Sequence, residues 1–305
     1  MPARTYEFVQ LDVFTQTALA GNPLAIFPDA RGLNDAEMQA LAREMNLSET
    51  TFIFPRDGAT EAREGKKVRI FTVEAELPFA GHPTLGTALY LYASESTKPA
   101  EITLDLKAGK VPVRFTANSG NGDGDRVDGQ LFGEMRQRDP EFGAPLSRDD
   151  VARVIGIAVE EIPLEWPIQP VSTGLTFTVV PFRNRQTLSD LKFSYVQAAE
   201  FLRNTGANFF YFLCPERREG RLEARARMFF YGGEDPATGS AAGCAATWMV
   251  QHGVAKSDEQ VVIQQGVECR RPSEMHVQAT REGGRVSNVR VGGYAVEILR
   301  GTVVL

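Results

Sequence analysis

Glu49, His82, Asp235 and Ser240 are the side chains of this sequence whose types and settings could move protons. Glu49 lies in NLSETTFIF, where a predicted helix ends and an apolar strand begins. A carboxylate at the edge of an apolar surface is a candidate general base, because desolvation raises the pKa of a carboxyl group toward useful values. The plainer interpretation of Glu49 is a turn or strand-edge carboxylate.

His82 and Asp235 begin two similar segments, HPTLGTAL and DPATGSAA, which lie half a chain length apart. Aligned without a gap, the segments share a proline, a glycine, a hydroxyl residue and an alanine. Each follows a strand-like run and a glycine, and each is expected to open a helix with proline in its first turn. Such self-similarity indicates duplication. A structural histidine and a helix-capping aspartate are the plainer interpretations, but the equivalent placement favours a catalytic role.

The two helices expected at 82–93 and 236–251 are apolar or small on almost every side. A helix without a solvent face must be surrounded, most simply by a curved sheet or open barrel. If the halves are related by an approximate two-fold axis, the two helix N-termini approach one cleft between them. Their N–H groups and positive dipole ends would bind an anion, most simply a substrate carboxylate, and Ser240 would lie in the first turn of the second helix.

The remaining sequence predicts short strands and a few amphipathic helices. One helix is opened by the capping pair Asn34 and Glu37, and another by Ser147 and Asp150. The pattern predicts an α+β fold of two pseudo-symmetric halves, each a curved mixed or antiparallel sheet around a central apolar helix. The division is expected within the glycine- and charge-rich segment 130–147, giving a first half of 1–140 and a second half of 141–294. Strand candidates are YEFVQLDVF, PLAIF, ETTFIF, KVRIF, ITLDL and VPVRF in the first half, and LTFTVVPF, NFFYFLC and RLEARARMFF in the second.

Composition excludes several classes of function. A net charge of −6 argues against nucleic acid as a partner, because phosphate binding requires clustered Lys and Arg. Three cysteines without CxxC spacing and three histidines without an HxxxH pair predict neither a disulfide framework nor a metal site. No P-loop or dinucleotide-binding motif occurs, so no cofactor is expected, and GNGDGD from Gly120 is expected to form a hairpin loop. Without a long apolar stretch or a secretory signal, we expect no membrane partner and a cytoplasmic location.

Seven segments resemble, in order, the signatures of PhzF-like proteins, the family of the phenazine-biosynthesis isomerase. The resemblance implies a diaminopimelate-epimerase-like fold in which strand 295–305 crosses back to complete the first half, and it suggests a homodimer. The paired AGHPTLGTA and EDPATGSAAG elements are its most specific part. The segments are GNPLAIF (21–27), LSETTF (47–52), ELPFAGHPTLGTA (76–88), STGLTF (172–177), GGEDPATGSAAG (232–243), QGVECRRPS (265–273) and VGGYAVEI (291–298).

The same resemblance implies a cofactor-independent isomerase that moves a proton within a small carboxylic acid, which is expected to be cyclic. It implies that Glu49 removes the carbon-bound proton and that His82 and Asp235 flank the substrate. Ser240 resembles a substrate contact, and Gly81 and Gly239 are expected at the same binding edge. No metal or organic cofactor is implied, because one carboxylate can take a proton from one carbon and return it elsewhere.

Two other functions stay open at this stage. A racemase or epimerase of the same fold could use two thiols, but Cys214, Cys244 and Cys269 all fall in the second half. The positions of the cysteines do not argue against racemisation through a carboxylate and an imidazole. A non-catalytic small-molecule-binding protein could also retain an enzyme fold. Deuterium uptake from heavy water by candidate carboxylic acids distinguishes catalysis from binding.

Overall fold

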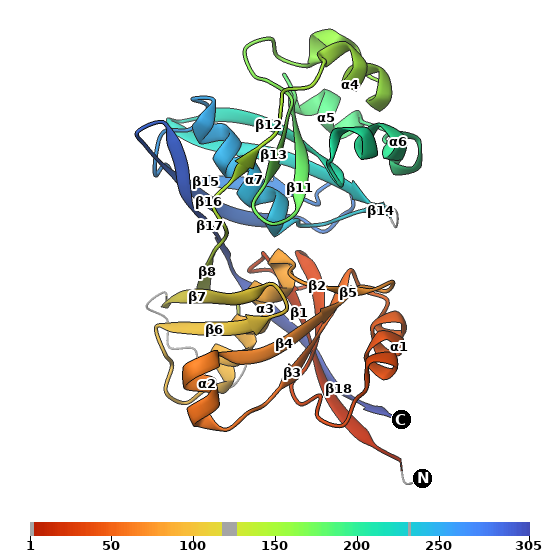
Figure 1. The fold of residues 1–305 in the computed structure, drawn as a ribbon, viewed down its shortest axis with the longest axis vertical. Helices are drawn as coiled ribbons and strands as arrows, with labels where there is room; N and C mark the ends of the chain where they lie inside the picture. The colour runs from red at the N-terminus through yellow and green to blue at the C-terminus, as the bar shows by residue number, and fades with distance from the viewer. Residues whose placement is uncertain (1–2, 118–126, 231–232) are drawn as a thin grey trace. The chain divides into compact units, whose positions relative to one another are not determined.

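The computed structural model describes residues 3–117, 127–230 and 233–305, which form two compact units (Figure 1). Unit 1 comprises Met1–Arg136 and Gly292–Leu305, and unit 2 comprises Gln137–Val291. The hairpin loop expected at GNGDGD lies outside the described residues. The expected domains of 1–140 with 295–305 and of 141–294 stay a prediction.

Unit 1 contains a mixed sheet with the strand order β18–β1–β2–β3–β4–β6–β7–β8. The pairs β2–β3 and β4–β6 are parallel, and the other pairs are antiparallel. The short β5 (Glu76–Leu77) pairs with β4. The C-terminal strand β18 therefore pairs with the N-terminal strand β1, although the two lie at opposite ends of the chain. The strands are β1 (Thr5–Val13), β2 (Asn22–Phe27), β3 (Glu49–Phe54), β4 (Lys66–Phe71), β6 (Glu101–Leu106), β7 (Gly109–Ala117), β8 (Leu131–Arg136) and β18 (Ala295–Val304).

The central helix of unit 1 is α3 (Gly81–Ser94), which joins the parallel strands β4 and β6. Parallel neighbours require a crossover connection, and this helix lies within it. It contacts β1, β2, β3, β6, β7 and β8, so the sheet curves around it (Figure 1). Gly86 permits the closest approach, because a Cβ at this position would lie 2.7 Å from side-chain carbons of both Val13 and Leu24. Gly86 is therefore a packing glycine, because any side chain at this position would overlap these carbons.

Helix α1 (Asp35–Met45) covers the other face of the unit 1 sheet. Its capping box is present as predicted, with Asn34 and Glu37 each bonding the other's backbone N–H. The helix buries Met38 and Leu41 in a cluster that includes the stacked rings of Phe27 and Phe52. With α3 on one face and α1 on the other, β2 and β3 are buried on both sides, which explains their continuous apolar sequence. The short helix α2 (Gly58–Glu64) was not predicted.

Unit 2 contains a second mixed sheet, with the strand order β9–β10–β11–β12–β13–β15–β16. The pairs β11–β12 and β13–β15 are parallel. The two-residue β14 (Gly233–Glu234) pairs with the end of β13. The strand β17 (Arg285–Gly293) follows β16 through a turn at 283–284. The strands of the sheet are β9 (Glu141–Phe142), β10 (Gln169–Ser172), β11 (Thr176–Pro181), β12 (Phe209–Arg218), β13 (Arg221–Phe230), β15 (Val261–Gln265) and β16 (Ser273–Glu282).

Helix α7 (Gly239–Gln251) takes the place in unit 2 that α3 has in unit 1. It joins the parallel strands β13 and β15, and it contacts β10, β11, β12 and β16. The opposite face of the sheet packs on an apolar cluster formed with the peripheral helices. These helices are α4 (Arg148–Ile155), capped by Ser147 as predicted, then α5 (Arg185–Asp190) and α6 (Tyr195–Thr205), with a 3-10 turn η1 at Val159–Glu161.

The two units thus repeat one design, in which a parallel strand pair is bridged by a buried helix inside a curved mixed sheet. The predicted α+β fold class is confirmed. One detail differs from the expectation, because α7 begins at Gly239 rather than at Pro236. Pro83 lies in the first turn of α3, whereas Pro236 precedes α7 and lies outside it. No helix within the described ranges is both long enough and apolar enough to span a bilayer.

Candidate active site

Glu49 and His82 come together in unit 1 because two adjacent structural elements begin beside each other. Glu49 is the first residue of β3 and pairs with Leu24 of β2, and His82 is the second residue of α3. The Glu49 Oε2 to His82 Nδ1 distance is 3.4 Å. The imidazole is buried, whereas 16% of the Glu49 side chain is exposed. A glutamate side chain that is only partly exposed therefore rests against a desolvated ring.

Burial holds the imidazole of His82 in its neutral form. Desolvation lowers the pKa of His82 from 6.5 to about 3, and a backbone hydrogen bond with Pro23 opposes this only weakly. The contact with Glu49 is therefore a polar contact of a neutral ring rather than an ion pair at neutral pH. A proton added to this buried ring would create an imidazolium without hydration, so the ring does not carry a positive charge at neutral pH.

Asn22 completes this cluster from the start of β2. Its Nδ2 lies 3.4 Å from His82 Nδ1, the same ring nitrogen that faces Glu49. The turn before it requires Gly21, whose φ is +69° and where a Cβ would lie 2.5 Å from the Val13 carbonyl oxygen. The glycine turn of the GNP segment therefore places the buried Asn22 amide beside His82.

The N-terminus of α3 lacks a capping side chain. Its N-cap is Ala80, which cannot accept a hydrogen bond through its side chain, and its first turn holds no acidic residue. Helices α1, α2, α4 and α5 are all capped by Asn, Asp or Ser side chains. Gly81 is the first residue of α3 and is buried beside His82. An uncapped, buried helix N-terminus of this kind is suited to an anion.

Asp235 belongs to a second cluster, at the N-terminus of α7 in unit 2. Its side chain is largely buried, and Thr238 Oγ1 donates a hydrogen bond of 2.6 Å to Asp235 Oδ2. Asp235 is not the N-cap of α7, because Thr238 occupies that position. Thr238 makes no side-chain cap either, since its hydroxyl is directed to Asp235. The interpretation of Asp235 as a helix cap is therefore wrong.

Gly239 and Ser240 form the first turn of α7, as the sequence predicted for Ser240. Gly239 contributes its carbonyl oxygen, which accepts a 2.9 Å hydrogen bond from Gln137 Nε2. Ser240 is buried, and its hydroxyl has no hydrogen-bond partner among the described residues. Gly243, one turn further on, is a packing glycine, because a Cβ there would lie 2.0 Å from Gln137 Oε1.

The three cysteines are free, as expected, but their burial is not uniform. Cys214 and Cys244 are buried, whereas Cys269 is only partly buried. Burial raises the pKa of each thiol to about 11. All three belong to unit 2, and none is a thiolate at neutral pH, which disfavours proton exchange between paired cysteines.

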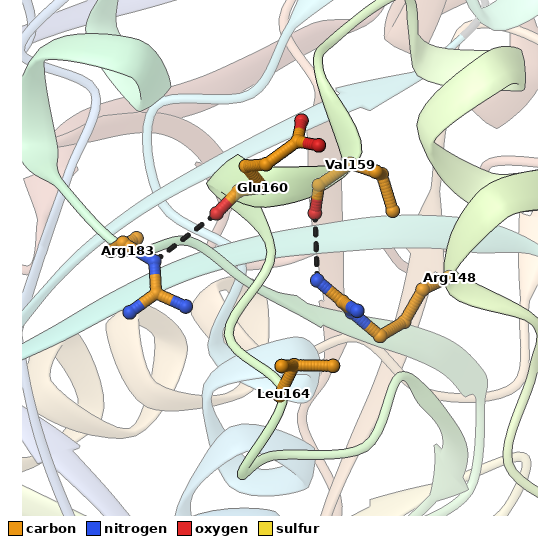
Figure 2. A pocket seen from close by; sticks show the side chains of 5 residues that line it. All are labelled: Arg148, Val159, Glu160, Leu164 and Arg183. Atoms are coloured by element: carbon orange, nitrogen blue, oxygen red, sulfur yellow. Dashed lines mark hydrogen bonds between the residues drawn. The ribbon is translucent and has the colours of Figure 1, made fainter.

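A surface pocket of unit 2 is lined by none of the predicted site residues (Figure 2). Arg183 Nε donates to the Glu160 carbonyl at 3.1 Å, and Arg148 donates to the Val159 carbonyl at 2.8 Å. These arginines hold the turn η1 in place. Since Glu160 is exposed and no histidine lines this pocket, it lacks a desolvated acid–base group. The fifth lining residue is Leu164.

The structure thus brings the predicted residues together as two clusters. Glu49, His82 and Gly81 lie in unit 1, and Asp235, Gly239 and Ser240 lie in unit 2. That all six serve one substrate stays a prediction. Sequence reasoning did not single out Asn22, Thr238, Gln265 or Tyr211, although the GNP, EDPATGS and QGVECRRPS segments contain the first three.

Comparison with solved structures first defines the class. A predicted epimerase from Pseudomonas aeruginosa superposes with a TM-score of 0.80 at 33% identity, covering 98% of this chain and 99% of the other. A phenazine biosynthesis protein of the PhzF family from Bacillus anthracis gives a TM-score of 0.83 at 26% identity, covering 99% and 100%. The chain therefore has the fold of the epimerase-like and PhzF-like proteins.

Sequence comparison then gives the family. The family model described as phenazine biosynthesis-like protein matches residues 11–301, and the chain belongs to this family. It is 36% identical over 305 residues to trans-2,3-dihydro-3-hydroxyanthranilate isomerase of Pseudomonas fluorescens, covering 98% of this chain and all of the relative. Several of its relatives are named as isomerases, and this protein is an isomerase.

Proposed function

We propose that this isomerase moves a proton within a small carboxylic acid and that Glu49 is the base that removes it. The observation that carries the proposal is the pair formed by Glu49 and the buried, neutral His82. Glu49 has the solvent access that a substrate-facing group needs, and the histidine behind it stays uncharged. The exchangeable proton therefore belongs to the carboxylate.

His82 faces Glu49 without gaining a charge. Its Nδ1 lies 3.4 Å from Glu49 Oε2 and 3.4 Å from Asn22 Nδ2. Burial keeps the ring neutral while the proton passes between the substrate and Glu49.

The uncapped N-termini of α3 and α7 support a carboxylate substrate. Both buried helices lack side-chain caps and first-turn acids, and each has a glycine as its first residue. Backbone N–H groups and positive dipole ends at such positions attract anions. We propose that Gly81 and Gly239 present these amides, that the Ser240 hydroxyl contacts the substrate, and that Asp235 serves the same reaction as Glu49.

For the substrate class, we propose a cyclic carboxylic acid like the one named for the relatives, trans-2,3-dihydro-3-hydroxyanthranilate. A hydroxy amino acid of this type carries the carboxylate that a helix N-terminus would bind. We further propose that the reaction needs no cofactor, since one carboxylate can both remove and return the proton. Homodimer formation and a cytoplasmic location stay predictions.

Racemisation by Glu49 and His82 as paired acid and base is the competing mechanism. It requires an imidazolium in one direction of the reaction. Burial makes that charge costly, since it lowers the pKa of His82 to about 3. A single-base isomerisation at Glu49 avoids this cost, and the geometry of the pair favours it.

Proton exchange catalysed by a Glu49→Gln variant is the direct test. The amide keeps the shape of the side chain but cannot accept a proton, so kcat should fall by at least 100-fold with KM little changed. Wild-type enzyme and variant are incubated in heavy water with a panel of cyclic and amino carboxylates that includes trans-2,3-dihydro-3-hydroxyanthranilate. Deuterium at carbon is followed by NMR and mass spectrometry.

Glu44→Gln is the matched control, because Glu44 is an exposed glutamate on α1. This control should exchange protons at the wild-type rate. A Glu49→Gln protein that also does so would remove Glu49 as the base. If the wild-type enzyme labels no member of the panel, the proposed substrate class is wrong.

A further inference from the structure

The carboxylate of Asp235 is held by a chain of buried hydrogen bonds that reaches into the core of unit 2. Thr238 Oγ1 donates to Asp235 Oδ2 at 2.6 Å. Gln265 Nε2 lies 2.9 Å from Thr238 Oγ1 and 2.8 Å from the carbonyl oxygen of Asp235. Tyr211 Oη donates to Gln265 Oε1 at 3.1 Å. Tyr211 and Gln265 are completely buried, so water does not compete for these groups.

Backbone groups fix the orientation of the Gln265 amide. The carbonyl of Asp235 can only accept, so the atom facing it must be the nitrogen. The backbone N–H of Thr238 can only donate, and it lies 3.4 Å from the other amide atom, which must be the oxygen. An amide rotated by half a turn would place its oxygen against the Asp235 carbonyl and its nitrogen against the Thr238 N–H. It would satisfy neither group.

This orientation determines which atom donates and which accepts in each hydrogen bond of the chain. Because Gln265 Nε2 donates to Thr238 Oγ1, the threonine hydroxyl uses that contact as an acceptor. Its own proton is then available for Asp235 Oδ2, at a distance typical of a bond to a charged acceptor. A hydrogen bond received by a carboxylate favours the ionised form over the neutral form.

Three ionisable neighbours of Asp235 in the described part of the chain do not supply this stabilisation. Burial and the Asp235 charge raise the pKa of Tyr211 well above its usual value, and burial raises the pKa of Cys269 to about 11, so both stay neutral. The carboxyl group of Glu234 pairs with Arg227 at 2.8 Å. The Thr238 hydroxyl, by contrast, donates directly to Asp235 Oδ2.

We propose that Thr238 and Gln265 are positioning residues for Asp235, with the Thr238 hydroxyl, oriented by the Gln265 amide, fixing the carboxylate and favouring its ionised form. This inference deepens the proposed function, on which the catalytic importance of Asp235 rests. It also explains why Thr238 does not cap α7. Its hydroxyl serves Asp235, and the helix N-terminus stays open for an anion.

Thr238→Val tests the inference, because valine keeps the branched shape and has a methyl group in place of the hydroxyl. The pKa of Asp235 is measured by carbon-13 NMR of the side-chain carboxyl, with the signal assigned through Asp235→Asn. Loss of a hydrogen bond to a charged group should raise this pKa by about one unit. The acid limb of the pH profile of kcat should move in the same direction, and Thr238→Ser should restore both values toward wild type.

Thr247→Val is the matched control, since Thr247 is a buried threonine of α7 whose hydroxyl donates to the Cys244 carbonyl at 2.8 Å. It should leave the titration of Asp235 unchanged. A folded Thr238→Val protein with the wild-type Asp235 titration would overturn the inference. If that variant does not fold, the exchange rate of the Thr238 hydroxyl proton is measured in the wild-type protein instead. Exchange with solvent as fast as that of an exposed threonine would also overturn the inference.

The NMR titration does not depend on turnover, so it separates this inference from the proposed function. A shifted titration together with full activity of Asp235→Asn would support the positioning chain and refute the role of Asp235 in the reaction. An unshifted titration with loss of activity in Asp235→Asn would do the reverse.

Discussion

The neutral, buried His82 predicts a specific loss of stability in acid. In the folded protein its pKa is about 3, against 6.5 for an ordinary histidine. An unfolded chain therefore binds a proton at His82 between these values, while the folded chain does not. Stability rises with pH wherever the unfolded state holds more protons. The contribution of His82 is thus complete above pH 6.5 and is lost progressively as the pH falls toward 3.

The magnitude follows from the two pKa values. At pH 5 the unfolded form gains about 2 kcal/mol from protonation of His82, relative to pH 8, and at pH 3 or below the gain approaches about 4–5 kcal/mol. His82→Gln removes the titrating group. The substitution lowers the free energy of unfolding at every pH. Between pH 8 and pH 5, however, the free energy of unfolding of the variant should fall by about 2 kcal/mol less than that of the wild type.

Urea unfolding followed by far-UV circular dichroism at pH 8 and pH 5 measures this difference. Tryptophan fluorescence is unsuitable, because Trp166 and Trp248 both belong to unit 2 and His82 belongs to unit 1. His276→Gln is the control, since His276 is only partly buried in β16 and should show a smaller effect. Equal pH dependence in wild type and His82→Gln would refute the neutral, desolvated state of His82.

Three further predictions concern other parts of the molecule. Glu234→Gln should lower the free energy of unfolding by about 3–5 kcal/mol, because it leaves the guanidinium of Arg227 buried without its charged partner; urea unfolding checks this value. Gly243→Ala should lower the melting temperature measured by calorimetry, since its methyl group would overlap the Gln137 amide, with an overpacking cost of about 1–3 kcal/mol. Dialysis against a chelator should leave the isomerase rate unchanged, and a rate restored only by added metal would contradict cofactor independence.

Local rules determined much of the secondary structure. The capping pair Asn34 and Glu37 and the cap Ser147 set the starts of α1 and α4, because these contacts lie within one turn. The apolar runs of β2, β3 and β12 predicted strands from composition alone. The absence of a polar face on α3 and α7 was enough to predict that each is enclosed by a sheet.

Only the tertiary structure decided the start of α7 and the hydrogen-bond partners of Asp235. The sequence favours a helix from Pro236, by analogy with Pro83, and an aspartate before proline is a common cap. Instead, Gln265 of β15 binds the Asp235 carbonyl and both the N–H and the hydroxyl of Thr238, which keeps residues 235–238 outside the helix. This partner comes from a distant strand, so no local pattern could reveal it.

The same division holds for the pair formed by Glu49 and His82. The sequence by itself identified Glu49 and His82 as candidate residues, since their motifs and settings are local. Their 3.4 Å contact depends on parallel pairing of β2 with β3 and on the passage of α3 through the curved sheet. The shift in the pKa of His82 depends on the burial that this packing produces. Proton chemistry requires both the residue types, which sequence supplies, and their desolvation, which arises only when distant segments pack together.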